Sequence, residues 1–372
     1  MRAPETVVVP FANDNPIMNH HTSYQGIGGN QPGTPGGQLK ASVHEDLIRS
    51  HAANLRLFRQ LEKVSGDRGS PRFEIFATFA AMIGKTNLAK DLLKEVALQL
   101  TDHYTEEEAA AVARILFEDR FGFTRTSMAL DPYLRISESG IVRLHKDLRK
   151  LKSGMPVQYV TGNARFCGLS FRVEPGILIP RQETEELVKL CAEALCDLNE
   201  PMVIDFCTGS GAIAVAIKKS FPASHVFATD YQAGILEIAS YNALKNNVVI
   251  DYFQHDLLTG ELPASLSHFD LVVSNPPYIP ESFKADLAVQ VKDFEPSAAL
   301  FVPDGDPVCF YRRLAEYSME ILRPGGVLLV ETDHRYNASV AGLFSAAGFG
   351  SVASLTDLSG KERFVTAMKN LN

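Results

Sequence analysis

The stretch Asp205-Phe206-Cys207-Thr208-Gly209-Ser210-Gly211 decides the fold of the larger part of this chain. It joins a short apolar run to a helical pattern, so its glycines lie where a strand gives way to a helix. Glycines at such a turn let the backbone approach a ligand closely, and the N–H groups at the start of the helix point at it. The spacing Gly209-x-Gly211-x-x-Ala214 also fits nicotinamide cofactors, so that alternative stays open here, beside a merely structural turn.

The sequence around this turn predicts an α/β sheet. From Met202 onward, short β-rich runs alternate with helical stretches, which is typical of a mainly parallel sheet. The last two runs are joined by a short Asp/Ser/Gly turn without a helix, which predicts an antiparallel hairpin at the sheet edge. Upstream, a hairpin is expected over Arg165–Val173 and a helix over Glu183–Leu198. The predicted strands are Met202–Cys207, His225–Asp230, Val249–Phe253, Phe269–Ser274, Gly326–Thr332, Ser351–Leu355 and Arg363–Met368.

The N-terminal part of the chain predicts a different organisation. Residues 1–44 are rich in Gly, Pro, Asn and Gln and are expected to be disordered, and residues 45–84 are expected to form a helical extension. Residues 85–155 predict a small helical domain, and residues 156–372 a hairpin linker plus the α/β domain. Three helices are clearest in the helical domain. The first is marked by Leu88, Leu92, Val96 and Leu100, the second is capped by Thr105 and ended by Gly122, and the third runs from Ser137 to Gly154.

Composition excludes several classes of protein. The chain has 372 residues, a length that suggests about two domains. Because 45% of the residues are hydrophobic, such domains can bury a sizeable hydrophobic core. Its net charge of −8 argues against a broad nucleic-acid-binding surface. No apolar run is long enough to span a membrane, and the start of the chain does not resemble a secretory signal. The five scattered cysteines show no metal-binding spacing, so no metal is expected, and they fit a cytoplasmic protein.

Polar residues follow the other strands at the same edge. Asp230 ends the second of these strands, where a carboxylate can accept both hydroxyls of a ribose, and His255-Asp256 follows the third. Asn275-Pro276-Pro277-Tyr278 comes directly after the fourth. A proline pair can be only a rigid strand exit. Its flanking Asn and Tyr at the ligand-binding edge instead indicate a site.

The tetrapeptide Asn275–Tyr278 suits methyl transfer to a planar nitrogen. The lone pair of an amide or amino nitrogen is delocalised, so that nitrogen is a poor nucleophile. The Asn275 side-chain oxygen and the Pro276 carbonyl can each accept one N–H, which orients the group and favours the positive charge that develops on it. Tyr278 can stack on the flat substrate group. We therefore predict Asn275, Pro276 and Tyr278 as catalytic residues, and Asn275 to Tyr278 as the substrate site.

These motifs together resemble an S-adenosylmethionine-dependent methyltransferase of the NPPY group. Further stretches, Tyr159–Gly162, Leu178–Glu185 and Phe294–Pro296, are similar to the HemK/PrmC family, and the resemblance spans about residues 85–370. Members of that family methylate the side-chain amide of the glutamine in the Gly-Gly-Gln loop of class-1 peptide chain release factors. The resemblance implies a seven-stranded, Rossmann-like methyltransferase domain, preceded by a small all-helical domain that recognises the substrate.

The resemblance also implies roles for single residues. S-adenosylmethionine would be bound by Cys207, Thr208, Gly209, Ser210 and Gly211 beside its methionine and adenosine parts, by Asp230 at the ribose, by Asp256 and Leu257 at the adenine, and by Asn275. Arg181, Glu183 and Glu185 would shape the mouth of the site, unless they are only surface ion pairs. The chain departs from the family pattern at Cys207, where glycine is common, at Leu257, where an aromatic can occur, and at Gln182-Glu183, where Pro then Asp is frequent.

Alternative functions follow from the same residues. The enzyme could methylate another protein glutamine, such as one on a ribosomal protein, or an adenine amino group, although the chain has no clear basic DNA-facing surface or target-recognition insert. A non-catalytic release-factor-binding protein that kept the fold is the alternative from another class. Intact Asp205, Gly209, Gly211, Asp230 and Asn275 argue against it.

Gly36-Gly37-Gln38 in the N-terminal tail spells the substrate motif of the family, and in so Gly- and Gln-rich a tract we attribute it to chance. Deleting residues 1–44 is therefore expected to leave folding and methyl transfer nearly unchanged, because no apolar surface there can join a core. Steady-state kinetics of the truncated protein measures this. A fall in the KM for release factor, reversed by adding the tail peptide, would instead indicate a tethered pseudo-substrate or a self-methylation site.

Overall fold

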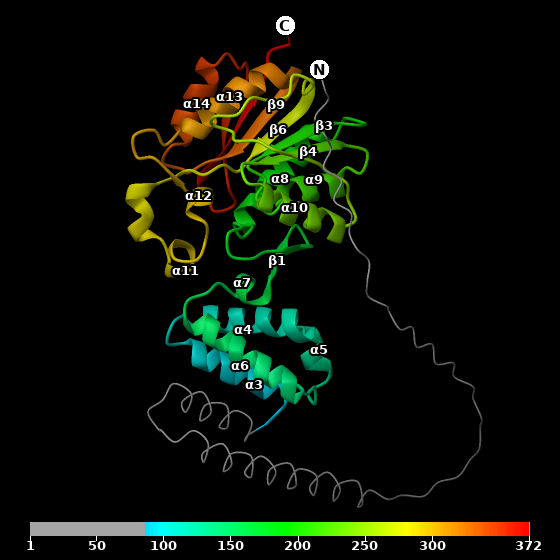
Figure 1. Ribbon diagram of the computed structural model, residues 1–372, viewed down its shortest axis with the longest axis vertical. Coiled ribbons are helices and arrows are strands. Elements are labelled where there is room, and N and C mark those ends of the chain that lie inside the picture. The colour runs from blue at the N-terminus through cyan, green and yellow to red at the C-terminus, as the bar shows by residue number, and fades with distance from the viewer. Residues whose placement is uncertain (1–85, 372) are drawn as a thin grey trace, which may run out of the picture. The chain divides into compact units, whose positions relative to one another are not determined.

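A mixed seven-stranded sheet organises the C-terminal part of the computed structural model, which describes residues 86–371 (Figure 1). The strand order is β10-β11-β9-β6-β3-β4-β5. Neighbours from β9 to β5 are parallel, whereas β11 pairs antiparallel with β9 and β10 antiparallel with β11. The predicted α/β sheet and its edge hairpin are thus confirmed. The bounds are β3 Met202–Phe206, β4 His225–Asp230, β5 Asp251–Gln254, β6 Phe269–Ser274, β9 Leu322–Glu331, β10 Val352–Thr356 and β11 Glu362–Met368.

Helices cover both faces of this sheet (Figure 1). α8 (Gln182–Leu195), α9 (Ala212–Ser220) and α10 (Ala233–Lys245) pack on one face, where side chains such as Leu187 and Val215 form one buried cluster. α13 (Cys309–Ile321) and α14 (Asn337–Ala346) pack on the other, around Tyr311 and Phe344. Because both faces are covered, the central strands are almost continuously apolar, as expected of a parallel sheet.

The segment before the sheet is helical, as predicted. α3 (Ala89–Leu100), α4 (Glu106–Phe121) and α6 (Glu138–Lys152) bury a common apolar core. The Thr105 side chain and the Glu108 carboxylate cap the first turn of α4 reciprocally, and Gly122 ends that helix in the left-handed conformation. Ser137 caps α6, as predicted. Two short helices were not predicted, α5 (Arg125–Leu130), which buries no side chain, and α7 (Val157–Thr161).

Several predicted bounds were wrong at their ends. β5 runs from Asp251 to Gln254, shifted from the predicted Val249–Phe253, and α8 ends at Leu195. β9 begins at Leu322, four residues before the predicted Gly326. Leu322 pairs with Phe269 and Val327 with Leu271, so a register shift absorbs Arg323–Gly326 within the strand. The Gly325-Gly326 pair therefore lies inside the ladder instead of marking its start.

The remaining elements connect these layers. β1 (Asn163–Phe166) and β2 (Leu169–Arg172) form the predicted hairpin around Gly168. Between β6 and β9 lie β7 (Ile279–Pro280), the 3-10 helix η1 (Glu281–Asp286), α11 (Val289–Lys292), α12 (Ser297–Leu300) and β8 (Phe301–Val302). No helix within residues 86–371 is long and apolar enough to cross a membrane. The predictions for residues 1–44 and 45–84, Gly36-Gly37-Gln38 included, concern residues outside the part that the structure describes.

Candidate active site

The loop Cys207–Gly211 joins β3 to α9 at the carboxyl edge of the sheet. Gly211 has φ +80, and a Cβ there would lie 3.3 Å from the Cα of Ala239 in α10, so any other residue would be strained. Gly209, with φ +54, has open space where a Cβ would be. Cys207 has φ +58, a left-handed conformation that favours glycine, and this position is one of the departures noted in the sequence. The loop therefore exposes its backbone toward whatever occupies this edge.

Asp230 ends β4, which lies beside β3 in the sheet. Its carboxylate accepts the Gly209 N–H at 2.9 Å through Oδ2 and the Tyr231 N–H at 2.9 Å through Oδ1. Burial raises the pKa of this carboxyl, and the two backbone donors act in the opposite direction. The backbone thus holds the acid at a fixed place beside the glycine loop.

These residues border one cavity of about 460 Å³, a volume typical of small-molecule sites. The predicted site residues that line it are Cys207, Thr208, Gly209, Ser210, Asp230, Asp256, Leu257, Asn275 and Pro277. Gly211, Pro276 and Tyr278 are not part of the lining. His255, expected at this edge, also lines the cavity, and so do Thr184, Tyr231 and Phe310, which were not predicted as site residues. The cavity therefore joins the ends of β3, β4, β5 and β6 in one site.

Asn275 and Tyr278 follow β6 and contact two buried polar residues. Asn275 donates through Nδ2 to the hydroxyl of Thr184 at 3.1 Å. Tyr278 donates through its hydroxyl to the Glu331 carboxylate at 3.2 Å, and its ring packs against the core cluster around Tyr311. Burial raises the pKa of Tyr278, and the neighbouring Glu331 charge adds to this effect. Asn275 thus borders the cavity while Tyr278 is anchored behind it.

The residues expected at the mouth of the site have different surroundings. Arg181 lines the cavity and pairs with the buried Glu295 at 2.5 Å, and Glu295 also accepts the Ile179 N–H at 3.2 Å. Glu185 instead accepts the Cys167 N–H at 2.9 Å, and Glu183 is exposed. Of the three, only Arg181 borders the cavity.

The cavity suits a cofactor with a nucleoside and a charged amino acid part. Asp205 is fully buried beneath the glycine loop, where it accepts the Thr208 hydroxyl at 2.7 Å through Oδ2, and it is not part of the cavity lining. The Asp230 carboxylate and the open backbone at Gly209, which both line the cavity, fit S-adenosylmethionine. Within residues 86–371, no cluster of three or more His, Cys, Asp or Glu could hold a metal.

Asp205 also predicts a pH dependence of stability. Burial raises the pKa of its carboxyl to about 7, so the folded state favours the protonated form. The stability that this group contributes is present below its ordinary pKa and is lost as the pH rises through about 7.

The Asn side chain of Asp205→Asn stays neutral at every pH. The melting temperature of this variant should therefore rise relative to that of the unchanged protein as the pH rises from about 4.5 to about 8. Thermal unfolding of both proteins, without cofactor, measures the difference. An equal difference at both pH values would contradict the account of Asp205.

The chain is similar to several known proteins and family models. Residues 181–323 match the family model "Methyltransferase small domain", and residues 91–162 match "PrmC N-terminal domain". The chain is 36% identical over 268 residues to a release factor glutamine methyltransferase of Bacteroides thetaiotaomicron, covering 72% of this chain and 95% of that protein. It is 33% identical to one of Caulobacter vibrioides, covering 76% and 94%. A solved release-factor-specific protein-(glutamine-N5) methyltransferase of Alicyclobacillus acidocaldarius is 28% identical, with a TM-score of 0.32, covering 54% of this chain and 99% of that one.

Proposed function

The chain belongs to the HemK/PrmC family, and we propose that it transfers a methyl group from S-adenosylmethionine to the side-chain amide nitrogen of the glutamine in the Gly-Gly-Gln loop of a class-1 peptide chain release factor. The observation that carries the proposal is that Asn275 and Asp230 border the same cavity, in a chain that spans 95% of a release factor glutamine methyltransferase. Because release factors act on the ribosome, we also propose a cytoplasmic role in translation termination.

The cofactor side of the mechanism rests on the glycine loop and the acids around it. S-adenosylmethionine supplies a methyl group bound to a positively charged sulfur. In the proposal Asp230 accepts the ribose hydroxyls, because its carboxylate is held at the cavity by backbone donors. Cys207 to Gly211 contact the methionine and adenosine parts, and Asp256 and Leu257 border the adenine.

The substrate side of the mechanism rests on Asn275. Its Oδ1 and the Pro276 carbonyl each accept one N–H of the glutamine amide, which aims the nitrogen at the methyl group. As positive charge develops on that nitrogen, the two acceptors become more favourable, and this lowers the barrier. The methylated nitrogen is acidic enough to lose its proton to solvent, so no strong general base is needed. In the proposal Tyr278, anchored behind the cavity by its hydrogen bond to Glu331, supports the strand exit that carries Asn275.

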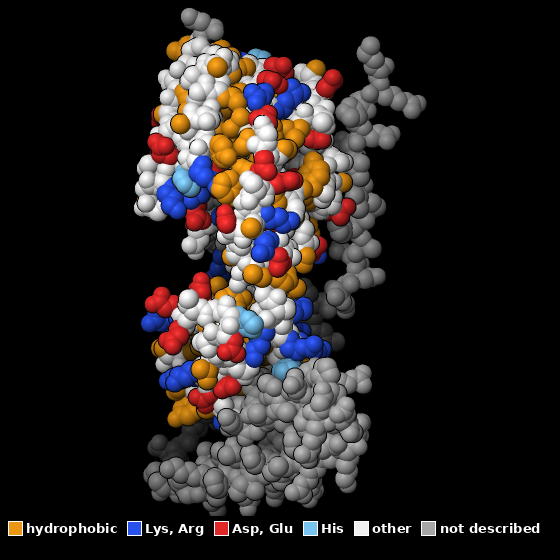
Figure 2. Space-filling model, turned by 90° about the vertical axis from the view of Figure 1, so that its left-hand side faces the viewer, with side chains coloured by type: hydrophobic (Ala, Val, Ile, Leu, Met, Phe, Trp, Pro, Cys, Tyr) orange, Lys and Arg blue, Asp and Glu red, His pale blue; other side chains and the backbone are white. Residues whose placement is uncertain are grey.

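Competing acceptors test the substrate class. Incubation with labelled S-adenosylmethionine and, separately, a release factor, a ribosomal protein preparation and duplex DNA should label only the release factor. Acidic and basic side chains are interspersed on the face shown in Figure 2, which supports a protein acceptor over DNA. Label on ribosomal protein or DNA alone would overturn the proposed substrate. If calorimetry shows no binding of S-adenosylmethionine, the protein would instead be a non-catalytic release-factor-binding protein.

A further inference from the structure

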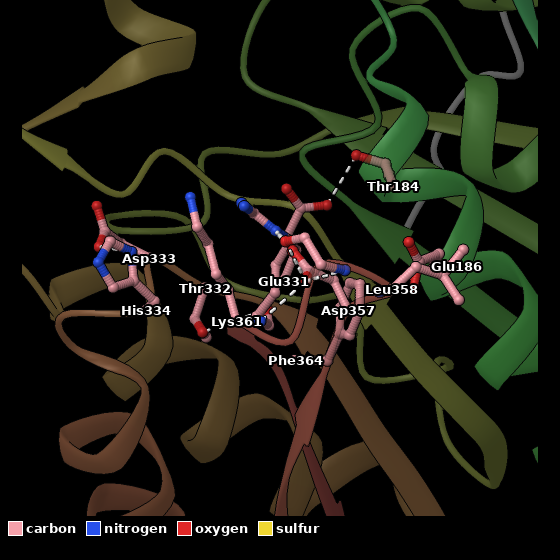
Figure 3. A network of polar contacts seen from close by, with 12 residues as sticks. Thr184, Glu186, Glu331, Thr332, Asp333, His334, Asp357, Leu358, Lys361 and Phe364 are labelled. Carbon is pink, nitrogen blue, oxygen red and sulfur yellow. Dashed lines mark hydrogen bonds and ion pairs between the residues drawn. The ribbon is translucent and has the colours of Figure 1, made fainter.

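A chain of buried and half-buried polar contacts begins at Asn275. Thr184 of α8 donates its hydroxyl to Oε2 of Glu331 at 2.7 Å, and Tyr278 donates its hydroxyl to Oε1 of the same carboxylate at 3.2 Å. Thr184 in turn accepts Nδ2–H of Asn275 at 3.1 Å. Figure 3 shows the Glu331 carboxylate pointing to Thr184 across the gap between β9 and α8. Glu331 is 1% exposed and Thr184 5% exposed.

The direction of these hydrogen bonds follows from the carboxylate. An ionised carboxylate can only accept, so each of its two oxygens receives one hydroxyl hydrogen here. Thr184 has a single hydroxyl hydrogen, which Glu331 uses, and so Thr184 can offer only a lone pair to Asn275. Asn275 must therefore present its NH2 group to Thr184. Its Oδ1 is then left for the cavity that Asn275 lines.

The surroundings of Glu331 act on the pKa of its carboxyl in opposite directions. Burial raises the pKa of this carboxyl, whereas the two hydroxyl donors and the charge of Arg363 lower it, and Glu183 raises it slightly. Arg363 is itself fixed by Asp357, with Nε 2.8 Å from Oδ2. Burying an ionised acid costs desolvation free energy, and apolar residues of similar volume often stabilise the fold as well or better. The contacts among Asn275, Thr184, Glu331 and Tyr278 therefore indicate a role beyond packing.

We propose that Thr184 and Glu331 are positioning residues, which hold the Asn275 carboxamide with Oδ1 toward the accepting amide nitrogen. The proposal deepens the proposed function and rests on it. With the carboxamide reversed, Asn275 would present N–H donors to the N–H donors of the substrate. That orientation cannot accept a hydrogen bond from the glutamine amide and cannot stabilise the charge on its nitrogen. We refer to Asn275, Thr184, Glu331 and Tyr278 as the orientation chain.

Paired substitutions separate hydroxyl chemistry from packing. Thr184→Val keeps the shape but removes the hydroxyl, and Thr184→Ser keeps the hydroxyl. Glu331→Gln offers an N–H where the carboxylate only accepted, and so permits the reversed orientation. We expect kcat to fall about tenfold in Thr184→Val and Glu331→Gln, the size of one lost buried partner, with cofactor affinity unchanged and with recovery in Thr184→Ser. Thr366→Val and Glu362→Gln in β11 are the matched controls, and should leave kcat unchanged.

A second readout does not depend on activity. In 15N-labelled protein, the side-chain NH2 signals of Asn275, assigned by their loss in Asn275→Ala, should exchange slowly with solvent because Thr184 accepts from them. They should shift and exchange faster in Thr184→Val and in Glu331→Gln, and return in Thr184→Ser. If one variant does not fold, the other still gives this result.

The outcomes separate the two proposals. Unchanged Asn275 NH2 signals in Thr184→Val and Glu331→Gln overturn the orientation chain, as does unchanged kcat in both. Equal loss of kcat in Thr184→Ser and Thr184→Val also overturns it, because packing would then explain the effect. Failure of the unchanged protein to methylate a release factor overturns the proposed function instead, and leaves the NMR result to decide the orientation of Asn275.

Discussion

Replacing Asn275 with alanine is expected to lower kcat about 10²–10³-fold, by analogy with the loss of one oxyanion-hole donor. The substitution removes one of the two acceptors that orient the substrate amide, while the glycine loop and Asp230 stay in place on other strands. Because the acceptor acts mainly as charge develops on nitrogen, the loss should fall on kcat more than on cofactor binding. Single-turnover methylation and cofactor affinity, measured on the same folded sample, give both quantities.

Asn199→Ala, in the exposed loop before β3, makes the same chemical change away from the cavity and should keep full activity. If Asn275 serves only to end β6, Asn275→Ala would lower the melting temperature and leave the turnover of folded molecules unchanged. That result would exclude Asn275 from catalysis.

Replacing Asp230 with alanine is expected to weaken S-adenosylmethionine binding tenfold or more. Two ribose hydroxyls would lose a charged acceptor, and hydrogen bonds to charged groups contribute about 1.5–3 kcal/mol each at most. The Gly209 and Tyr231 N–H groups would also lose their partner, so the glycine loop would be less well held. Calorimetric titration with the cofactor measures the change.

Asp251→Ala is the matched control for this variant, because Asp251 is exposed at the start of the neighbouring strand β5. Its cofactor affinity should equal that of the unchanged protein. Unchanged affinity in Asp230→Ala would mean that the ribose binds elsewhere in the cavity, and the assignment of Asp230 would then be wrong.

The best-predicted parts of the fold are those with strong local signals. The bounds of β4 and β6 were predicted correctly, because both are mostly buried runs that pair with a parallel strand on each side. The second predicted helix was also recognisable, because Thr105 and Glu108 form a capping box and Gly122 ends it. By contrast, β7, α11 and α12 have two to four residues each, too few to show a period.

The site was predictable where its residues follow strands, and not where they come together only through tertiary packing. Asp230 and Asn275 stand at strand ends, and strand ends of a parallel sheet meet at one edge. Thr184 and Glu331 are 147 residues apart, one inside a helix and one at the last position of β9. A threonine between glutamates looks like part of a solvated helix start. Only the packing of α8 on β9 brings it between Asn275 and Glu331.

Mass spectrometry of a release factor tests the central claim most directly. Purified release factor is incubated with this protein and S-adenosylmethionine, digested and mapped peptide by peptide, with Asn275→Ala in parallel. The account predicts a gain of about 14 Da, one methyl replacing one hydrogen, on the glutamine of the Gly-Gly-Gln loop, and none with Asn275→Ala. An unmodified glutamine, or the same gain on a different residue, would contradict it.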